Sequence, residues 1–190
     1  YKKYKYYVFH SDSDGGTDSG SDSVLVTNTD PTITSIEVTP DSGVKTNTLL
    51  TCTVKATDPD DTRAPTINYQ WSDTAGAILG TASTLQLTPT NSSPADTITC
   101  TATANDADGG SATDSDSVTV ENTDPNITSV EVRPSKGVDT STTLTCIAAA
   151  TDADGGTPSL SYAWSNVTDS TTYTSTTDTL VLTPATVSPT

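Results

Sequence analysis

The side chains that usually carry out chemistry are scarce in this chain. Its 190 residues include one histidine, His10, one phenylalanine and three cysteines, against 24 acidic residues. No motif places a serine or cysteine nucleophile beside His10, the only imidazole that could act as its base. Paired carboxylates lie in turns that recur along the sequence, and an active site would hardly be copied into each of them. We therefore expect that the protein is not an enzyme.

Aspartates are the clearest candidate ligands, and they cluster beside glycine and proline. Oxygen-rich clusters of this kind suit Ca²⁺. Because aspartate and glycine also favour turns and keep a surface soluble, a purely structural role is the alternative. The candidate calcium ligands are Asp12, Asp14, Asp30, Asp58, Asp60, Asp106, Asp108, Asp124, Asp152 and Asp154.

Charge and composition exclude two other classes. The formal net charge is -16, whereas a protein that binds nucleic acid needs a basic face for the phosphates. No apolar run approaches the ~20 residues that cross a bilayer, so no membrane span is expected. Only 32% of the residues are hydrophobic, which alone would favour disorder, but their ordered spacing favours a folded chain.

An internal repeat organises the sequence. The stretch that begins at Pro31 matches the stretch that begins at Pro125, a shift of 94 positions. Residues 1–30 match the end of the unit that precedes Pro125. The chain therefore divides into the back end of one unit (1–30), a complete unit (31–124) and the front end of another (125–190). Placing one copy after another would complete the broken unit.

The hydrophobic pattern within each unit is that of β-strands. Apolar residues alternate with threonine from Leu50 to Thr57 and from Thr97 to Ala104, a period of two that marks half-buried strands. Clusters of Gly, Pro, Asp and Asn interrupt the pattern every ~10 residues, as they do in β-sandwiches. No segment has a helical period, so the fold class is predicted to be all-β.

Cys52, Trp71 and Cys100 have the spacing of strands B, C and F in an immunoglobulin domain. Together with the motifs Leu50-Thr51-Cys52, Tyr69-Gln70-Trp71, Asp106-Ala107-Asp108-Gly109-Gly110 and Asn122-Thr123-Asp124-Pro125, they make the unit resemble the Ig-like or PKD-like tandem repeats of large bacterial surface proteins. The resemblance implies immunoglobulin-like β-sandwiches in tandem, and an extracellular, secreted or cell-surface location. It says little about function, because such sandwiches have many roles.

The resemblance also implies a disulfide between Cys52 and Cys100. Such a bridge closes a loop of about 48 residues and typically contributes ~3–4 kcal/mol of stability; two buried free thiols are the alternative. Cys146 lacks the equivalent partner, and the N-terminal residue at that position is Tyr6. We expect Cys146 to be a buried free thiol beside the Tyr6 ring, with an intermolecular disulfide as the alternative.

In an immunoglobulin-like topology, the turns that carry the aspartates share one end of the sandwich. The joints with Asp30 and Asp124 would arrive at that end, so a calcium site between units is predicted there. Glycans are the other candidate non-protein component, because sequons occur at Asn91, Asn126 and Asn166. Chance sequons in a chain whose outer strand faces are rich in threonine are the alternative. No cofactor is required.

Residues 125–190 would supply strands A to E of a sandwich and leave its core face and strand edges uncovered. Residues 1–30 of a neighbouring copy are the natural filler, with Tyr4, Tyr6 and Val8 facing inward. This is donor-strand complementation, a form of β-augmentation. Because donor and acceptor are different surfaces, the expected product is a head-to-tail homopolymer, an extracellular filament.

Two other functions remain open at this point. The chain could be an excerpt of a calcium-stiffened tandem-repeat stalk in a large surface adhesin, or a spacer module attached to a secreted hydrolase. The composition of residues 1–10 favours the filament subunit over a slice of a uniform array. That segment holds four of the seven tyrosines, the only phenylalanine and the only histidine, where the complete unit has a threonine-rich strand.

Overall fold

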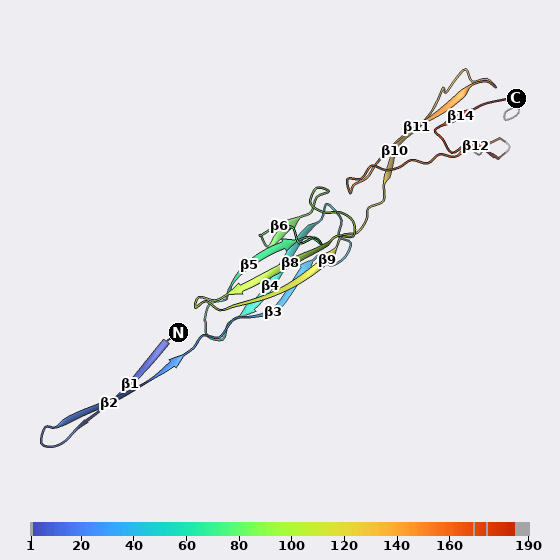
Figure 1. The fold of residues 1–190 in the computed structure, drawn as a ribbon. Helices are drawn as coiled ribbons and strands as arrows, with labels where there is room; N and C mark the ends of the chain where they lie inside the picture. The colour runs from blue at the N-terminus through green and yellow to red at the C-terminus, as the bar shows by residue number, and fades with distance from the viewer. Residues whose placement is uncertain (1, 169, 174, 185–190) are drawn as a thin grey trace.

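The computed structural model describes residues 2–168, 170–173 and 175–184, and every regular element in these ranges is a β-strand (Figure 1). The all-β fold class is therefore confirmed. The described residues contain no helix that is long and apolar enough to cross a membrane. The strands are β1 (Lys2–Ser11), β2 (Thr17–Val26), β3 (Thr32–Thr39), β4 (Leu49–Thr57), β5 (Thr66–Ser72), β6 (Ile78–Gly80), β7 (Thr84–Gln86), β8 (Thr97–Asn105), β9 (Ser111–Thr119), β10 (Asn126–Arg133), β11 (Thr143–Thr151), β12 (Trp164–Asn166), β13 (Thr171–Tyr173) and β14 (Thr179–Val181).

Strands β3 to β9 form two antiparallel sheets, which we call the central sandwich. One sheet has the order β3-β4-β7 and the other the order β6-β5-β8-β9, an arrangement consistent with immunoglobulin-like sandwiches. The period-two pattern decides which side chains face the other sheet. Along β8, burial alternates at every residue, with Ile98, Cys100, Ala102 and Ala104 fully buried between half-buried threonines.

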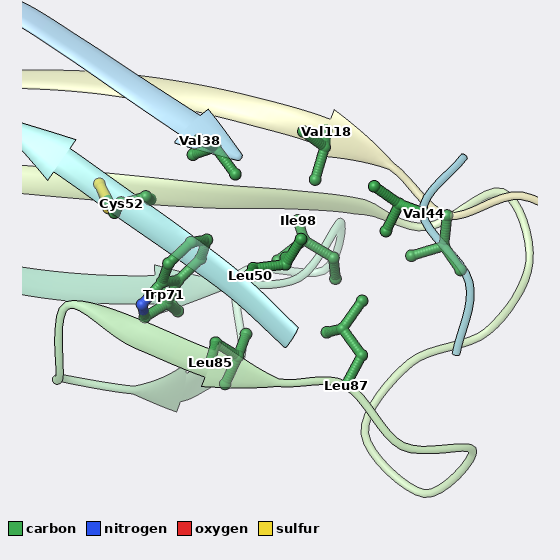
Figure 2. Packing of buried hydrophobic residues seen from close by; sticks show 11 residues of the cluster. Val38, Val44, Leu50, Cys52, Trp71, Leu85, Leu87, Ile98 and Val118 are labelled. Carbon is green, nitrogen blue, oxygen red and sulfur yellow. A yellow bond between two sulfur atoms is a disulfide. The ribbon is translucent and has the colours of Figure 1, made fainter. Parts of the chain in front are cut away.

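The core lies between these two sheets (Figure 2). Trp71 from β5 and Leu50 from β4 are fully buried and face each other across the sandwich with Ile98 from β8. The indole Nε1 of Trp71 donates a hydrogen bond to the carbonyl oxygen of Ala82 at 2.9 Å, so the buried ring leaves no polar group without a partner.

Strands β1 and β2 form a two-stranded sheet of their own, which we call the N-terminal hairpin. It extends away from one end of the central sandwich, with its turn farthest from that end (Figure 1). Every residue of both strands is exposed. An isolated two-stranded hairpin is at best marginally stable in water. Packing of its apolar face against further strands would stabilise it.

Strands β10 to β14 lie at the opposite end of the central sandwich, and we call them the C-terminal half-sandwich (Figure 1). They form a sheet with the order β10-β11-β14 and a separate hairpin, β12–β13. Residue pairs reproduce those of the central sandwich, because Ile127 pairs with Ala150 as Ile33 pairs with Ala56, and the same bulge follows each pair. Within the described residues, no counterpart of β8 or β9 pairs with β12.

Candidate functional site

The N-terminal hairpin has the register of β8–β9. Lys3 pairs with Leu25 in the hairpin, and Thr97 pairs with Thr119 in β8–β9. Both residues of the second pair lie 94 positions after those of the first, and the correspondence continues along both strands. The turns agree as well. The backbone N–H of Gly16 donates to Oδ1 of Asp12 at 2.7 Å, and the equivalent bond at Gly110 is also 2.7 Å long. The hairpin is therefore a copy of β8–β9 in its backbone, but without a sandwich around it.

The side chains on the inward register of this hairpin are exposed. Tyr4, Tyr6 and Val8, the residues predicted to face a core, are 58%, 70% and 50% exposed. The β8 residues at the same register positions are fully buried; they are Ile98, Cys100 and Ala102. The same alternation thus produces a core strand in one place and an uncovered apolar face in the other.

The opposite face of β1 carries a row of side chains that the sequence analysis did not single out. The Nζ atom of Lys5 lies 4.9 Å from the centroid of the Tyr7 ring, and the Tyr7 and Phe9 rings stack with centroids 6.2 Å apart. In β8 these positions hold threonines. The signal in the sequence is the alternation itself, which places Lys5, Tyr7 and Phe9 together on the side away from the core.

As far as the structure describes it, the C-terminal half-sandwich has the framework of a core but no second layer of strands that covers it. Its Trp164 donates to the carbonyl oxygen of Thr177 at 3.1 Å, as Trp71 does to Ala82, yet Trp164 is only half-buried. Val132 is 40% and Val138 is 45% exposed. Their equivalents in the central sandwich are almost fully buried; they are Val38 and Val44. The uncovered side is the one that β8 and β9 occupy in the central sandwich.

The cysteines follow this difference. Cys52 and Cys100 form a disulfide across the central sandwich, with Cα atoms 6.4 Å apart. A disulfide is typical of oxidising compartments. Cys146 is a free thiol and half-buried. The predicted contact between Cys146 and Tyr6 joins two molecules, so it stays a prediction.

Strand β9 is held to the edge of the other sheet mainly by carboxylates. Oδ2 of Asp116 accepts a hydrogen bond from the backbone N–H of Val38 at 2.8 Å. Just beyond β9, Oε1 of Glu121 accepts one from the N–H of Gly43 at 2.9 Å, and the N–H of Glu121 donates to the carbonyl of Val44 at 2.7 Å. The two carboxylate bonds join residues 78 apart in the sequence, and the sequence analysis did not identify them.

Asp22 on β2 stands at the position of Asp116. Its Oδ1 accepts a bond from the N–H of Ser23 at 2.7 Å, and Asp116 makes the same bond with Ser117 at 2.8 Å. Oδ2 of Asp22 corresponds to the oxygen through which Asp116 binds Val38. The half-sandwich residue equivalent to Val38 is Val132.

Several of the predicted calcium ligands lie at the two joints, where they bind the chain itself. At the first joint, Asn28 donates to Oδ2 of Asp106 at 2.8 Å, and this bond lowers the pKa of Asp106. Oδ2 of Asp60 accepts from the N–H of Thr29. At the second joint, Oδ2 of Asp154 accepts from the N–H of Thr123 at 2.6 Å.

The second joint has one further bond. The hydroxyl of Thr46 donates to Oδ1 of Asp154 at 2.8 Å, and Asp154 is thus shared between the central sandwich and the half-sandwich. The bond from Thr123 first, and that from Thr46 next, lower the pKa of Asp154. The two joints therefore use an aspartate at the same repeat position to bind the incoming chain.

The aspartates that the structure describes are not gathered into a metal centre. Within the described ranges, no group of three or more His, Cys, Asp or Glu side chains is placed to hold a metal ion. Asp30 lies beside Asp106 around Gly110, and Oδ2 of Asp58 is buried without a hydrogen bond. The remaining candidates lie in turns or at the second joint; they are Asp12, Asp14, Asp108, Asp124 and Asp152. A calcium site stays a prediction.

The three sequon asparagines differ in accessibility. Asn126 begins β10 and is exposed, whereas Asn91 and Asn166 are half-buried. The amide of Asn91 donates to the carbonyl of Gln86 at 3.1 Å, a bond that a glycan on the same nitrogen would disturb. Among the three, Asn126 is the most open to modification.

Comparisons with protein families, with curated proteins and with solved structures found no match. The class of protein is therefore defined by its architecture, an all-β chain of sandwich units with one disulfide. Function has to be argued from the geometry of the hairpin and the half-sandwich.

Proposed function

We propose that the protein is the structural subunit of an extracellular filament, in which the N-terminal hairpin of one copy completes the C-terminal half-sandwich of the next. One observation carries the proposal. The hairpin has the register of β8–β9 without a sandwich around it. The half-sandwich has the strand pairing of β3-β4-β7 and β5-β6, and none of the described strands covers its core face. Each supplies what the other lacks.

Chain length directs the hairpin to another molecule. In a completed half-sandwich, Val26 would take the place of Val120, at the end that faces away from the central sandwich. That place is about 60 Å from Pro31, because the central sandwich and the half-sandwich both lie between the two points. A sandwich built on nine-residue strands is about 30 Å long. The link from Val26 to Pro31 spans at most about 17 Å. A chain cannot complete itself, and the contact propagates into an open polymer.

The side-chain volumes of the two parts support this pairing. Three of the inward positions are larger on β1 than on β8, with Tyr4, Tyr6 and Val8 in place of Ile98, Cys100 and Ala102. Two positions of the half-sandwich are smaller; they are Val130 in place of Ile36 and Ala148 in place of Val54, both of which pack against the central core. Because cores are close-packed, larger donor side chains need smaller neighbours.

The experiment compares the full chain with a variant that lacks residues 1–30. We expect filaments of the full chain in electron micrographs and a monomer for the truncated chain in sedimentation. A synthetic peptide of residues 1–30 should bind the truncated chain and, added in excess, should stop growth of the full chain. Polymerisation of the truncated chain to the same extent would refute the proposal.

The joints favour a second candidate, the calcium-stiffened stalk of an adhesin. The bonds of Asp60 to Thr29 and of Asp154 to Thr123 fix successive units in the same way, as a tandem array would need. In a stalk, removal of residues 1–30 would leave the remaining units intact and the solution state unchanged. Calorimetry with Ca²⁺ tests the stiffening, and the absence of both a heat of binding and a gain in melting temperature would exclude it.

A further inference from the structure

We propose that residues 27 and 139 form a charge filter that admits the N-terminal hairpin to the half-sandwich and disfavours the β8–β9 hairpin of another copy. The inference rests on the proposed function and concerns its specificity. It starts from the equivalent pair in the central sandwich, Glu121 and Lys45, which holds the end of β9 in place.

That pair has a defined geometry. The Nζ atom of Lys45 lies 3.1 Å from Oε2 of Glu121 and 2.8 Å from the carbonyl oxygen of Asn122, to which it donates. The side chains of Lys45 and Glu121 are 35% and 51% exposed. The hydrogen bond from Lys45 lowers the pKa of Glu121, so the pair is charged at neutral pH. The other oxygen of Glu121 binds the N–H of Gly43.

The repeat keeps the surroundings of this pair and changes the pair itself. Asn28 matches Asn122, Gly137 matches Gly43, and Val138 matches Val44. The backbone contacts at the end of β9 can therefore form again when the hairpin docks. The two charged positions differ. Thr27 occupies the position of Glu121, and Asp139 occupies the position of Lys45.

Asp139 is an ionised group at the position where Lys45 stands. Its Oδ1 accepts hydrogen bonds from the hydroxyl and the N–H of Ser141, and these bonds lower its pKa. The nearest cation in the sequence, Lys136, lines a surface depression together with Glu131 and Arg133. The acceptor thus presents a negative charge to whatever residue occupies position 27 of the docked hairpin.

Each hairpin is free of an electrostatic penalty only in its own acceptor, with Glu121 beside Lys45 in the central sandwich and Thr27 beside Asp139 in the half-sandwich. Thr27 is neutral and its hydroxyl can donate to Asp139. Glu121 of a foreign β8–β9 hairpin would meet Asp139 as a like charge, which disfavours the wrong partner. The reverse error, an N-terminal hairpin in an unfinished central sandwich, would leave Lys45 without its carboxylate. The filter matters before the Cys52–Cys100 disulfide forms. Once formed, the disulfide fixes β8 covalently in its own sandwich.

The test measures how fast full-length subunits add, at low salt, to filament seeds made of the same variant. Thr27→Glu should slow addition about fivefold, equivalent to about 1 kcal/mol, the upper range for a partly exposed pair. Thr27→Lys should speed it by a similar factor. Thr27→Glu combined with Asp139→Lys should restore the rate, and raised salt should reduce the effects of Thr27→Glu and Thr27→Lys.

Ser23→Glu is the matched control, because it adds the same charge to β2 on the face away from the acceptor. Equal slowing by Thr27→Glu and Ser23→Glu, or no recovery in the double variant, would overturn the charge filter. Filaments would still form in both of those outcomes, so the proposed function would stand. Loss of the effect of residues 1–30 on assembly would instead refute the proposed function itself.

Discussion

Replacement of Tyr6 by alanine is the sharpest test of the hairpin as a core strand. Tyr6 is 70% exposed in the single chain and occupies the register position of Cys100, which is fully buried. An aromatic side chain buries about 200 Å² in a core, so docking would remove about 140 Å² from water. At about 25 cal/mol per Å² this contributes about 3.5 kcal/mol, and Tyr6→Ala should lose about 3 kcal/mol of it.

The readout is the critical concentration for polymerisation, measured by sedimentation of filaments at equilibrium. A loss of about 3 kcal/mol corresponds to an increase of about 150-fold. Tyr7→Ala is the matched control, because Tyr7 is the next residue, is also a tyrosine and faces the other side of β1. It should raise the critical concentration by less than about fivefold, through loss of its contacts with Lys5 and Phe9.

Two results would refute this reasoning. One is a Tyr6→Ala protein that polymerises at the wild-type concentration. The other is an equal effect of Tyr6→Ala and Tyr7→Ala, which would mean that β1 does not present one face to a core. Circular dichroism of each variant monitors the central sandwich, which neither substitution touches.

Three further predictions follow from the same geometry. Asp22→Ala should raise the critical concentration about tenfold, because Val132 would lose a charge-assisted bond worth ~1.5 kcal/mol, whereas Asp18→Ala, at the position of Ala112, should leave it unchanged. The Cys146 thiol should react with a maleimide in free subunits and be protected in filaments; equal rates would contradict the docked arrangement. Because the pKa of Asp154 lies below its ordinary value of 3.8, its ionised form stabilises the second joint above that value, and the contribution is lost as the pH falls through the lowered pKa. An NMR titration of the Thr123 amide should follow that pKa, and a midpoint at or above the ordinary value would contradict the bond.

Much of the fold was predictable because its signals are local. The alternation along β4 and β8 predicted strands and their buried faces. The Cys52–Cys100 disulfide was expected only from the resemblance to Ig-like repeats, and it is present. The bonds of Asp116 to Val38 and of Thr123 to Asp154 were not predicted. Each bond joins an aspartate side chain to a backbone N–H that is distant in the sequence. The local pattern around an aspartate does not indicate which N–H it will bind.

The sequence by itself determined the phase of the repeat and the face on which each side chain of a strand stands, because both depend only on residue order and on a period of two. Tertiary structure alone decided whether a face is covered. Ile98 and Tyr4 occupy the same position of the same alternating pattern, yet Ile98 is fully buried and Tyr4 is 58% exposed. The reason is that burial requires a second sheet, and that sheet comes from residues far away in the chain.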